Sequence, residues 1–371
     1  MIQPKADHDL SSDPCNDSAF MLRCCDLAAR AAGHTAPNPL VGSVVVQDGV
    51  IVGEGFHPKA GEPHAEVFAL QAAGDRAQNA ILYVNLEPCN HTGRTPPCSE
   101  AVIAAGIRRV VIGMRDPNPQ AEGGIEKLRA AGTEVTAGVE EARCRQLNEA
   151  FIHRITHRRP FGILKYAMTL DGKIATTTGH SAWVSSPQSR QQVHQLRSRC
   201  DAVIVGGNTV RKDNPNLTSH GEGDRHPLRI VMSRQLNLPT VANLWNVETA
   251  PTLVFTQSDA NSEVKTALMS QGVAVEAIAD LTPAAVMERL YQRGLMSVLW
   301  ECGGTLAAEA IAQGTVQKVW AFIAPKLIGG SGAPSPIGDL GLTEMTDALS
   351  LQSVSVTSVG HDFLLKGYLP S

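Results

Sequence analysis

Apolar residues recur along this chain at two alternating spacings, one typical of helices and one typical of strands. Residues 18–33 are apolar at helical spacing, and Ser18 can cap the start of that helix while Gly33 can end it. Residues 40–56 contain two apolar runs separated by Asp48-Gly49, a pair typical of a tight turn between strands. Helical and strand patterns continue to alternate after this hairpin. The alternation predicts an α/β fold.

A polar, basic segment interrupts the pattern, which then begins again. Residues 153–160, HRITHRRP, follow a helix predicted near 140–151 and are the best candidate for a boundary. After them we predict a strand from 161, a helix with Pro187 near its start, and a turn-rich connection at 208–218. The sequence thus predicts a disordered leader at 1–17, an α/β domain at 18–152, a linker at 153–160 and a second α/β domain at 161–371.

The composition is that of an ordinary globular protein and narrows the possible functions. Of the 371 residues, 43% are hydrophobic and 18% are charged, and the formal net charge is −4. No overall basic field favours nucleic acid, and no apolar run is long enough to span a bilayer. The polar leader lacks an apolar signal core, and eight scattered cysteines do not suggest a disulfide framework. We therefore expect a cytoplasmic protein that binds neither membranes nor nucleic acid.

Three potential zinc ligands and one acid lie near predicted element ends. His64 opens one predicted helix, Cys98 opens the next, and Cys89 follows a predicted strand, so the three side chains can meet at a sheet edge. One imidazole and two thiolates leave the fourth tetrahedral position open, as in catalytic zinc sites. Glu66 is placed to transfer protons there. The H-x-E half of the zinc nucleobase deaminase pattern is present, but eight residues instead of two separate the cysteines.

Other interpretations of these residues remain open at this point. His64 could cap a helix, Glu66 could be solvated, and the cysteines could be packing residues. A closed structural zinc site would need a fourth ligand, for which His91 is the candidate. The long loop between the cysteines also contains Arg94 and hydroxyl side chains, which suit a phosphate-bearing substrate beside a metal. A merely solvated loop is the alternative.

Longer segments support a more specific interpretation. The first half contains TAPNPLVGSVVV, HPKAGEPHAEVFAL and NLEPCNHTGRTPPC, and the second half contains KYAMTLDGKIAT, SAWVSSPQSR, DNPNLT and WECGGTLAAEA. These segments resemble the bifunctional deaminase/reductases of riboflavin biosynthesis, over nearly the whole chain from about Ser18. The resemblance implies a cytidine-deaminase-like α/β/α domain followed by a dihydrofolate-reductase-like α/β domain, with Zn²⁺ and NADPH as cofactors. It also implies a small phosphorylated pyrimidine as substrate, and we expect a homo-oligomer.

The same resemblance implies two consecutive reactions and assigns residues to the first. Hydrolytic deamination of 2,5-diamino-6-ribosylamino-4(3H)-pyrimidinone 5′-phosphate would precede NADPH-dependent reduction of the ribosyl group to ribityl. His64, Cys89 and Cys98 would bind zinc, and Glu66 would be the proton shuttle. The remaining contacts implied for the deaminase substrate are Asn38 and His57 around the pyrimidine, and His91 and Arg94 at the phosphate.

The second half lacks a G-x-G-x-x-G dinucleotide fingerprint. Glycines at 303–304 directly follow a predicted strand, so the turn at 303–305 could cradle a diphosphate with its backbone N–H groups or could simply allow close packing. The resemblance favours NADPH, and the contacts that it implies are Ala167, Trp183, Thr209, Asp213, Ser233, Gly303, Gly304 and Thr305. For the reductase substrate it implies Ser181, Arg197, Leu217 and Glu301. His220 stands where an arginine for the substrate phosphate is expected, and Met232 stands where an acidic residue often occurs.

Competing functions can be weighed against these features. A deaminase whose second domain only binds substrate or oligomerises would not need DNPNLT and ECGGTLAAEA intact. A zinc-stabilised nucleic-acid-binding module fits poorly with the acidic net charge and 4% aromatic residues. A free nucleoside or tRNA deaminase is the nearest enzymatic rival for the first half, but its usual short cysteine spacing is missing.

Overall fold

The computed structural model describes residues 14–91 and 96–370. The chain divides into two compact units, with the division between His157 and Arg158. Residues 1–13 of the predicted leader lie outside the described residues. Helix α1 (Pro14–Ala29) begins before Ser18, so residues 14–17 are helical, and the prediction that they belong to a disordered leader is wrong. No helix in the described ranges is both long and apolar enough to cross a membrane.

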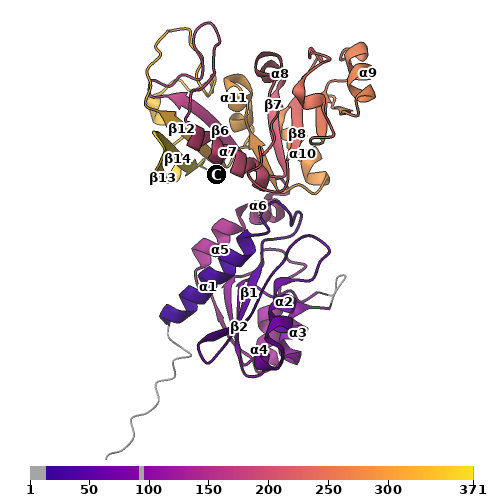
Figure 1. Ribbon diagram of the computed structural model, residues 1–371, viewed down its shortest axis with the longest axis vertical. Helices are drawn as coiled ribbons and strands as arrows, with labels where there is room; N and C mark the ends of the chain where they lie inside the picture. Colours follow the sequence, from indigo (N-terminus) through magenta and orange to yellow (C-terminus); the bar gives the residue numbers. More distant parts are fainter. Residues whose placement is uncertain (1–13, 92–95, 371) are drawn as a thin grey trace, which may run out of the picture. The chain divides into compact units, whose positions relative to one another are not determined.

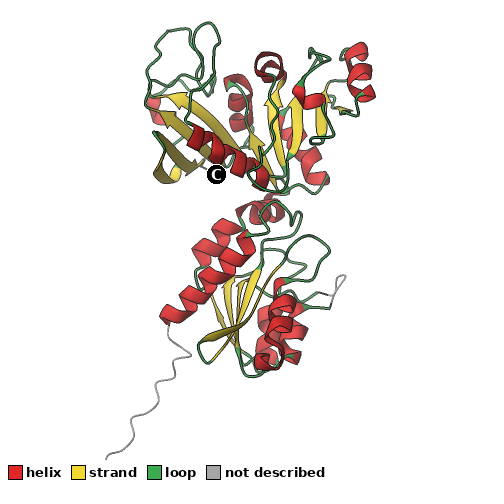
Figure 2. Cartoon of the chain, viewed as in Figure 1, coloured by secondary structure: helices red, strands yellow, loops and turns green. Residues whose placement is uncertain are grey.

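The first unit is a five-stranded sheet covered by helices on both faces (Figures 1 and 2). Its strands are β1 (Gly42–Gln47), β2 (Val50–Phe56), β3 (Ile81–Leu86), β4 (Arg109–Met114) and β5 (Glu134–Ala137), in the order β2-β1-β3-β4-β5. β1 is antiparallel to β2 and β3, whereas β3, β4 and β5 are parallel. Asp48 and Gly49 form the turn between β1 and β2, as predicted, and both have positive φ.

Two separate cores explain the three layers of this unit. Helices α2 (Ala65–Ala73), α3 (Cys98–Ala104) and α4 (Gly124–Ala130) pack on one face, where Val84, Val102 and Leu128 are fully buried. Helices α1 and α5 (Glu141–Leu147) cover the other face, where Met21 and Cys144 are fully buried. The fold is therefore the predicted α/β/α arrangement.

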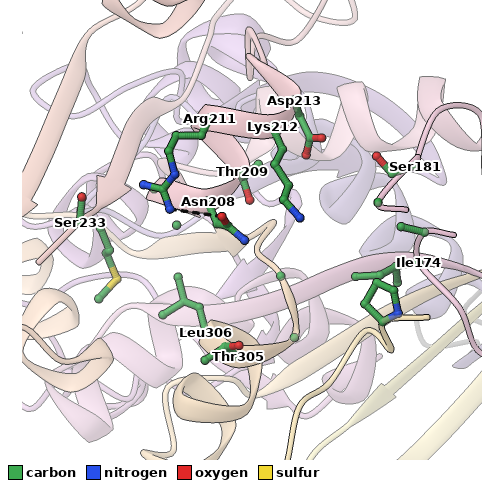
Figure 3. A pocket seen from close by; sticks show the side chains of 18 of the residues that line it. Ile174, Ser181, Asn208, Thr209, Arg211, Lys212, Asp213, Ser233, Thr305 and Leu306 are labelled. Atoms are coloured by element: carbon green, nitrogen blue, oxygen red, sulfur yellow. Dashed lines mark hydrogen bonds between the residues drawn. The ribbon is translucent and has the colours of Figure 1, made fainter. Parts of the chain in front are cut away.

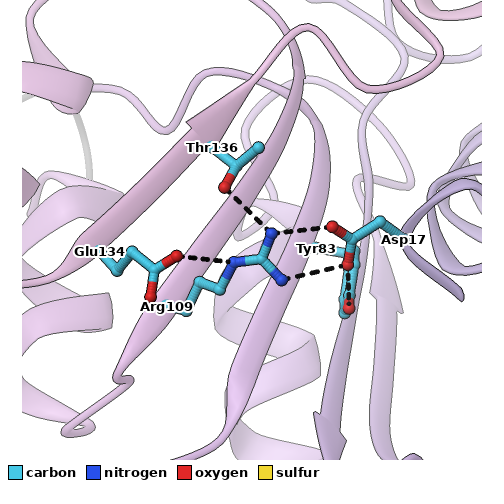
Figure 4. A network of polar contacts seen from close by, with 5 residues as sticks. All are labelled: Asp17, Tyr83, Arg109, Glu134 and Thr136. Atoms are coloured by element: carbon cyan, nitrogen blue, oxygen red, sulfur yellow. Dashed lines mark hydrogen bonds and ion pairs between the residues drawn. The ribbon is translucent and has the colours of Figure 1, made fainter. Parts of the chain in front are cut away.

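A buried polar network fixes α1 against the sheet (Figure 4). The Arg109 guanidinium on β4 donates to both carboxylate oxygens of Asp17 at 3.2 and 2.8 Å, and the Tyr83 hydroxyl donates to Asp17 at 2.8 Å. Arg109 also contacts Glu134 and Thr136 on β5. Since Asp17 precedes Ser18, this tertiary contact lies in the segment that the sequence pattern assigned to the leader.

The second unit is a nine-stranded sheet. Its strands are β6 (Phe161–Thr169), β7 (Ala202–Gly206), β8 (Leu228–Met232), β9 (Thr252–Thr256), β10 (Ala274–Ala277), β11 (Ser297–Trp300), β12 (Lys318–Ala324), β13 (Gln352–Val359) and β14 (Asp362–Tyr368). The order is β10-β9-β8-β7-β11-β6-β12-β14-β13, and every pair is parallel except the two that involve β14. Trp300 is fully buried in the main core, which includes residues of α10 (Pro283–Gln292) and α11 (Gly304–Ala312).

The helices of this region differ from the sequence pattern in two places. The helix predicted near 140–151 is two helices, α5 and α6 (Glu149–His157), because Asn148 between them exchanges two hydrogen bonds with the backbone of Leu40. Residues 153–157 of the predicted linker lie in α6. The connection predicted at 208–218 as turn-rich begins instead with a helix, α8 (Gly207–Asp213). The remaining helices are α7 (Pro187–Arg199) and α9 (Ser262–Ser270).

Candidate functional site

His64, Cys89 and Cys98 meet at one end of the first unit. His64 is the N-cap residue of α2 but makes no side-chain capping bond, Cys98 is the first residue of α3, and Cys89 follows β3. The His64 Nδ1 atom lies 3.2 Å from the Cys98 sulfur and 3.5 Å from the Cys89 sulfur. All three ligand atoms lie within 4.8 Å of one another. The structure therefore brings the three predicted metal ligands together.

The separations in this cluster fit zinc. Zinc binds sulfur at about 2.3 Å and imidazole nitrogen at about 2.0 Å, so tetrahedral ligand atoms around one ion lie about 3.5–3.8 Å apart. The two nitrogen–sulfur distances are close to that value. A hydrogen bond from Cys98 lowers the pKa of the Cys89 thiol, and the neighbouring Cys89 thiolate raises the pKa of Cys98. Zinc binds cysteine as the thiolate, so binding of a divalent cation here would replace this hydrogen bond.

Glu66 lies beside the cluster and is almost completely buried, with 3% of its surface exposed. Its Oε2 atom is buried and has no hydrogen-bond partner among the described residues. Burial raises the pKa of this carboxyl group to about 7, although His64 acts in the opposite direction. A buried carboxyl oxygen without a partner requires a ligand or a water, so the site is shaped for a group that Glu66 can exchange protons with.

Asn38 and His57 are joined to this site by a chain of hydrogen bonds. His57 Nδ1 lies 3.0 Å from the carbonyl oxygen of Pro63, which can only accept, so Nδ1 carries the proton. Nε2 then accepts from the side-chain amide of Asn38 at 3.1 Å. Burial lowers the pKa of His57, which agrees with a neutral ring. His57 is 2% exposed, whereas Asn38 is half-buried, so Asn38 is the more accessible of the two.

The other residues of the long loop are only partly described. His91 is exposed and does not belong to the metal cluster, so the described residues do not support a fourth ligand from His91. Arg94 lies outside the described residues. Sequence patterns gave no signal for Glu87. Its carboxylate accepts hydrogen bonds from the backbone N–H groups of Asp116, Gly123 and Ile125. These bonds connect the start of α4 to the residues before Cys89.

The second unit contains two adjoining cavities. The larger, of about 580 Å³, is lined in part by the segments that follow β7, β8 and β11 (Figure 3). The smaller is about 340 Å³. The carboxyl ends of parallel strands are the usual ligand-binding edge of such a sheet. The larger cavity is lined by the predicted residues Thr209, Asp213, Ser181, Ser233, Gly303, Gly304 and Thr305. The smaller is lined by Ala167, Trp183, Arg197 and Glu301, and also by Ser181, Thr209, Asp213 and Gly303.

The geometry of the glycine turn before α11 is compatible with both roles that the sequence allowed, close packing and contact with a diphosphate. A Cβ atom at Gly303 would meet nothing within 4 Å, so the backbone there is open to the cavity. A Cβ atom at Gly304 would lie 2.9 Å from the backbone oxygen of Ser335, so that glycine is required for close packing. The first N–H groups of a helix have no partner inside the helix and favour anions. The turn is therefore a suitable place for a diphosphate.

Helix α8 positions the side chains of Thr209 and Asp213. The two residues are four positions apart, so both lie on one face of the helix, and both line the two cavities. Burial raises the pKa of Asp213, and a hydrogen bond with Ser181 acts in the opposite direction. The structure thus brings Ser181, Thr209 and Asp213 together where the cavities adjoin.

Arg197 and Glu301 form a nearly buried ion pair in the smaller cavity. Arg197 donates to both Glu301 oxygens, at 2.5 and 2.9 Å, and to the Thr218 carbonyl at 3.1 Å. Lys165, for which the sequence gave no signal, lies 3.6 Å from Glu301. Burial would raise the pKa of Glu301, but Arg197 and Lys165 outweigh that effect and lower it to about 2. The site therefore holds more positive than negative charge, as a phosphate ester requires.

Two residues that the sequence singled out, Leu217 and His220, are not among the residues that line the two cavities. Leu217 is 3% exposed and is not among the residues that line either cavity, because its side chain packs in the interior. His220 is exposed, and its ring stacks on His194 with centroids 4.3 Å apart. His194, which the sequence did not single out, lines the smaller cavity.

Trp183 and Arg190 also line the smaller cavity. Trp183 is 69% exposed, and the Arg190 guanidinium lies 4.3 Å from the centre of its ring. The Lys326 ammonium donates to the backbone oxygen of Trp183 at 2.6 Å. Asp171 accepts hydrogen bonds from the backbone of Ile328 and Gly329, so it fastens the segment after β12 to the turn after β6.

Comparisons with known families match both units. Residues 14–114 match the family described as the cytidine and deoxycytidylate deaminase zinc-binding region. Residues 160–365 match the RibD C-terminal domain. The two matches correspond to the metal cluster and to the cavities, respectively.

Whole-chain relatives agree with these two matches. The chain is 61% identical to "Riboflavin biosynthesis protein RibD" of Synechocystis sp. over 95% of this chain and 96% of the relative. It is 48% identical to "Riboflavin biosynthesis protein PYRR, chloroplastic" of Arabidopsis thaliana, over 95% of this chain and 61% of that protein. A crystal structure from Thermotoga maritima superposes with a TM-score of 0.87 at 38% identity, over 96% of this chain and 99% of the other. That structure is described as a diaminohydroxyphosphoribosylaminopyrimidine deaminase/5-amino-6-(5-phosphoribosylamino)uracil reductase.

Proposed function

This chain belongs to the RibD family of bifunctional deaminase/reductases of riboflavin biosynthesis, and from that premise we propose which residues carry each reaction. The first unit hydrolytically deaminates 2,5-diamino-6-ribosylamino-4(3H)-pyrimidinone 5′-phosphate, releasing ammonia. The second unit uses NADPH to reduce the ribosyl group of the product, which gives 5-amino-6-(5-phosphoribitylamino)uracil. Zinc and NADPH are the cofactors.

In the deaminase site, His64, Cys89 and Cys98 hold the zinc ion, as their mutual distances support. Zinc, when bound there, makes a water molecule acidic enough to serve as a nucleophile near neutral pH. Glu66 takes a proton from the attacking water and returns one to the amine that leaves as ammonia. The observation that carries this role is the buried Oε2 atom of Glu66, which has no partner among the described residues and lies beside the cluster.

The substrate ring is held by Asn38, and His57 orients Asn38. The Pro63–His57–Asn38 hydrogen bonds use the amide nitrogen of Asn38, so its carbonyl oxygen is directed to donors on the pyrimidine. His91, which is exposed beside the cluster, and Arg94 bind the substrate phosphate. A fixed amide and a cationic loop together select a ring that carries a phosphorylated sugar.

In the reductase site, the turn at Gly303, Gly304 and Thr305 binds the diphosphate of NADPH through backbone N–H groups. NADPH, when bound, supplies the hydride. Ala167, Trp183, Thr209 and Asp213 position the nicotinamide end, and Ser233 contacts the adenosine end. This placement is supported by the cavity linings: Thr209 and Asp213 line both cavities, Ala167 and Trp183 line the smaller one, and Ser233 lines the larger one.

The sugar phosphate lies in the smaller cavity. Ser181, Arg197 and Glu301 contact the substrate, and Lys165 adds a second cation beside Glu301. Glu301 holds Arg197 by two hydrogen bonds, which fixes the guanidinium in one orientation. A contact from Leu217 stays a prediction from the family resemblance alone.

We further propose that the chain forms a homo-oligomer. Strand β13 is an edge strand whose residues 352–358 are exposed, among them Val354 at 50% and Val356 at 58%. Such an edge offers unpaired backbone groups to another chain. Light scattering of the purified protein tests this point. A cytoplasmic location and the lack of membrane or nucleic-acid partners stay predictions, which cell fractionation and analysis of co-purified material can check.

The two activities are tested in order on one sample. Ammonia release is measured first without NADPH, and NADPH is then added while absorbance near 340 nm is followed. Glu66→Gln should lose ammonia release by a factor of about 10² to 10⁴ while it still binds zinc. Glu62→Gln is the matched control, since Glu62 is an exposed carboxylate two residues before His64. Ammonia release at the wild-type rate from zinc-loaded Glu66→Gln would remove the proposed role of Glu66.

A further inference from the structure

Both members of the Asn38–His57 pair depend on one short backbone segment, residues 38–42. Asn38 begins the segment, and the carbonyl oxygen of Val41 accepts a hydrogen bond from the backbone N–H of His57 at 2.9 Å. A shift of the segment would therefore move Asn38 and His57 relative to each other. Their side chains are 3.1 Å apart, so the pair requires a segment that is held in place.

Asn85 holds this segment from β3. The regular pairing of β1 with β3 ends at Ser43. Beyond that point the side chain of Asn85 continues the pairing: its Oδ1 atom accepts from the Gly42 N–H at 2.8 Å, and its Nδ2 atom donates to the Leu40 carbonyl at 2.9 Å. One side-chain amide thus extends the hold of the sheet on the chain toward Asn38.

Asn148 holds the same segment from the junction between α5 and α6. Its Oδ1 atom accepts from the Leu40 N–H at 2.8 Å, and its Nδ2 atom donates to the Leu40 carbonyl at 2.9 Å. The orientation of each amide is fixed, because a backbone N–H can only donate and a carbonyl can only accept. The Leu40 carbonyl therefore accepts from two asparagine side chains that come from distant parts of the chain.

Burial makes these hydrogen bonds costly to lose. Asn85 is 0% exposed and Asn148 is 2% exposed. A buried amide without partners is unfavourable, so the two side chains and the backbone segment fix each other. Packing restricts the segment further, since a Cβ atom at Gly42 would clash with the backbone oxygen of Cys24 on α1. The segment therefore has little freedom to move while both amides are in place.

We propose that Asn85 and Asn148 are positioning residues for deamination, which hold residues 38–42 so that Asn38 presents its amide to the pyrimidine. This inference rests on the proposed role of Asn38 in substrate binding. Both asparagines act through the backbone of Leu40. When either is lost, Asn38 is no longer held against His57, and the substrate ring binds less tightly. Because this contact holds the ring equally before and during the reaction, its loss should raise KM with little change in kcat.

The test is steady-state kinetics of ammonia release by the zinc-loaded full chain. Asn85→Ala and Asn148→Ala should each raise KM about tenfold, as expected when one hydrogen-bonded contact with the substrate is lost, while kcat changes less than about threefold. Ser43→Ala is the matched control. Ser43 is also fully buried, and its hydroxyl donates to the Tyr83 carbonyl at 2.9 Å, so this variant loses a buried hydrogen bond beside the segment without releasing it. Its KM should not change.

A double-mutant cycle separates positioning from a general loss of stability. In an Asn38→Ala background, Asn148→Ala should change kcat/KM less than about twofold, because the side chain through which it acts is absent. A tenfold effect that persists in this background would overturn the inference. Where an alanine variant does not fold, Asn85→Ser and Asn148→Ser, which keep a hydroxyl, should raise KM by a smaller factor. An unchanged KM in these folded serine variants would equally overturn the inference.

Hydrogen exchange provides a readout that requires no substrate. The N–H groups of Leu40 and Gly42 are bonded to the asparagine side chains, so residues 40–42 should exchange faster in Asn85→Ala and Asn148→Ala than in Ser43→Ala, as mass spectrometry measures. Unchanged exchange would overturn the inference even if deamination is impaired. Faster exchange combined with no ammonia release from the wild-type protein would instead overturn the proposed function, and with it the role of the two asparagines in deamination.

Discussion

The substitution Asp17→Asn should destabilise the first unit without any change at the metal cluster. Asp17 and Arg109 have side chains that are each 8% exposed, and their closest oxygen–nitrogen distance is 2.8 Å. Replacing the carboxylate of Asp17 by an amide leaves the positive charge of Arg109 buried without the negative charge of Asp17. Breaking a buried pair in this way typically costs 3–5 kcal/mol, and because Glu134 remains 3.3 Å from Arg109, we expect about 3 kcal/mol.

The magnitude converts to a large shift in melting temperature. For a unit of this size, each kcal/mol lowers Tm by about 2–4 °C, so the expected decrease is about 6–12 °C. The assay is scanning calorimetry of the full, zinc-loaded chain. The transition that responds to a zinc chelator identifies the first unit, and the one that responds to NADP⁺ provides an internal reference. Only the first should move.

A matched control isolates the buried pair from the loss of charge on α1. Asp26 lies on the same helix and is exposed, so Asp26→Asn removes the same charge without breaking the network. If Asp17→Asn lowers Tm by no more than Asp26→Asn, the network in Figure 4 does not anchor α1 and the reasoning is refuted. An equal shift of both calorimetric transitions would refute the assignment of the effect to the first unit.

Three further predictions follow from the two sites. Removing zinc with a chelator should abolish ammonia release but leave NADP⁺ binding unchanged, because all three ligands lie in the first unit; a parallel loss of NADP⁺ binding would contradict this. Gly303→Ala should weaken NADP⁺ binding with little change in Tm. Gly304→Ala places a methyl group 2.9 Å from a backbone oxygen, so it should lower the free energy of unfolding of the second unit by about 1–3 kcal/mol, which calorimetry measures. The pKa of Glu301 is lowered to about 2, so its charge should contribute about 3 kcal/mol above pH 4.5 that is lost as pH falls toward 2. Urea unfolding at several pH values should therefore show the stability difference between wild type and Glu301→Gln narrowing in acid, and a constant difference would contradict the prediction.

Short-range patterns were sufficient for much of the fold and for the deaminase cluster. Side chains that face a core must be apolar, and they recur at one spacing in a helix and at another in a strand. The alternation of strands and helices can therefore be predicted from the spacing of apolar residues. Asp48-Gly49 specified a tight turn because it supports positive φ. His64 and Cys98 were recognisable because both stand at helix starts, and helix starts beside a sheet edge converge.

Contacts between distant residues could not be predicted in this way. Nothing in the local sequence shows that Asp17 is buried, since its partner Arg109 is 92 residues away. Helix α8 was missed because a seven-residue segment rich in polar residues has little helical pattern of its own, and its contacts with β7 and β8 stabilise it instead. The pairs Arg197–Glu301 and Lys165–Glu301 exist only because β11 inserts beside β6 and β7 in the sheet.

The sequence by itself thus determined the element types, the chemistry of the zinc ligands and, through longer motifs, the family. The tertiary structure decided which polar groups are buried and which face a cavity. It buried His57 behind Asn38, packed Leu217 into the interior and brought the buried amides of Asn85 and Asn148 to the backbone of Leu40. The physical reason is that periodicity records only whether a side chain faces inward, whereas burial, charge pairing and open space depend on the elements that pack against it.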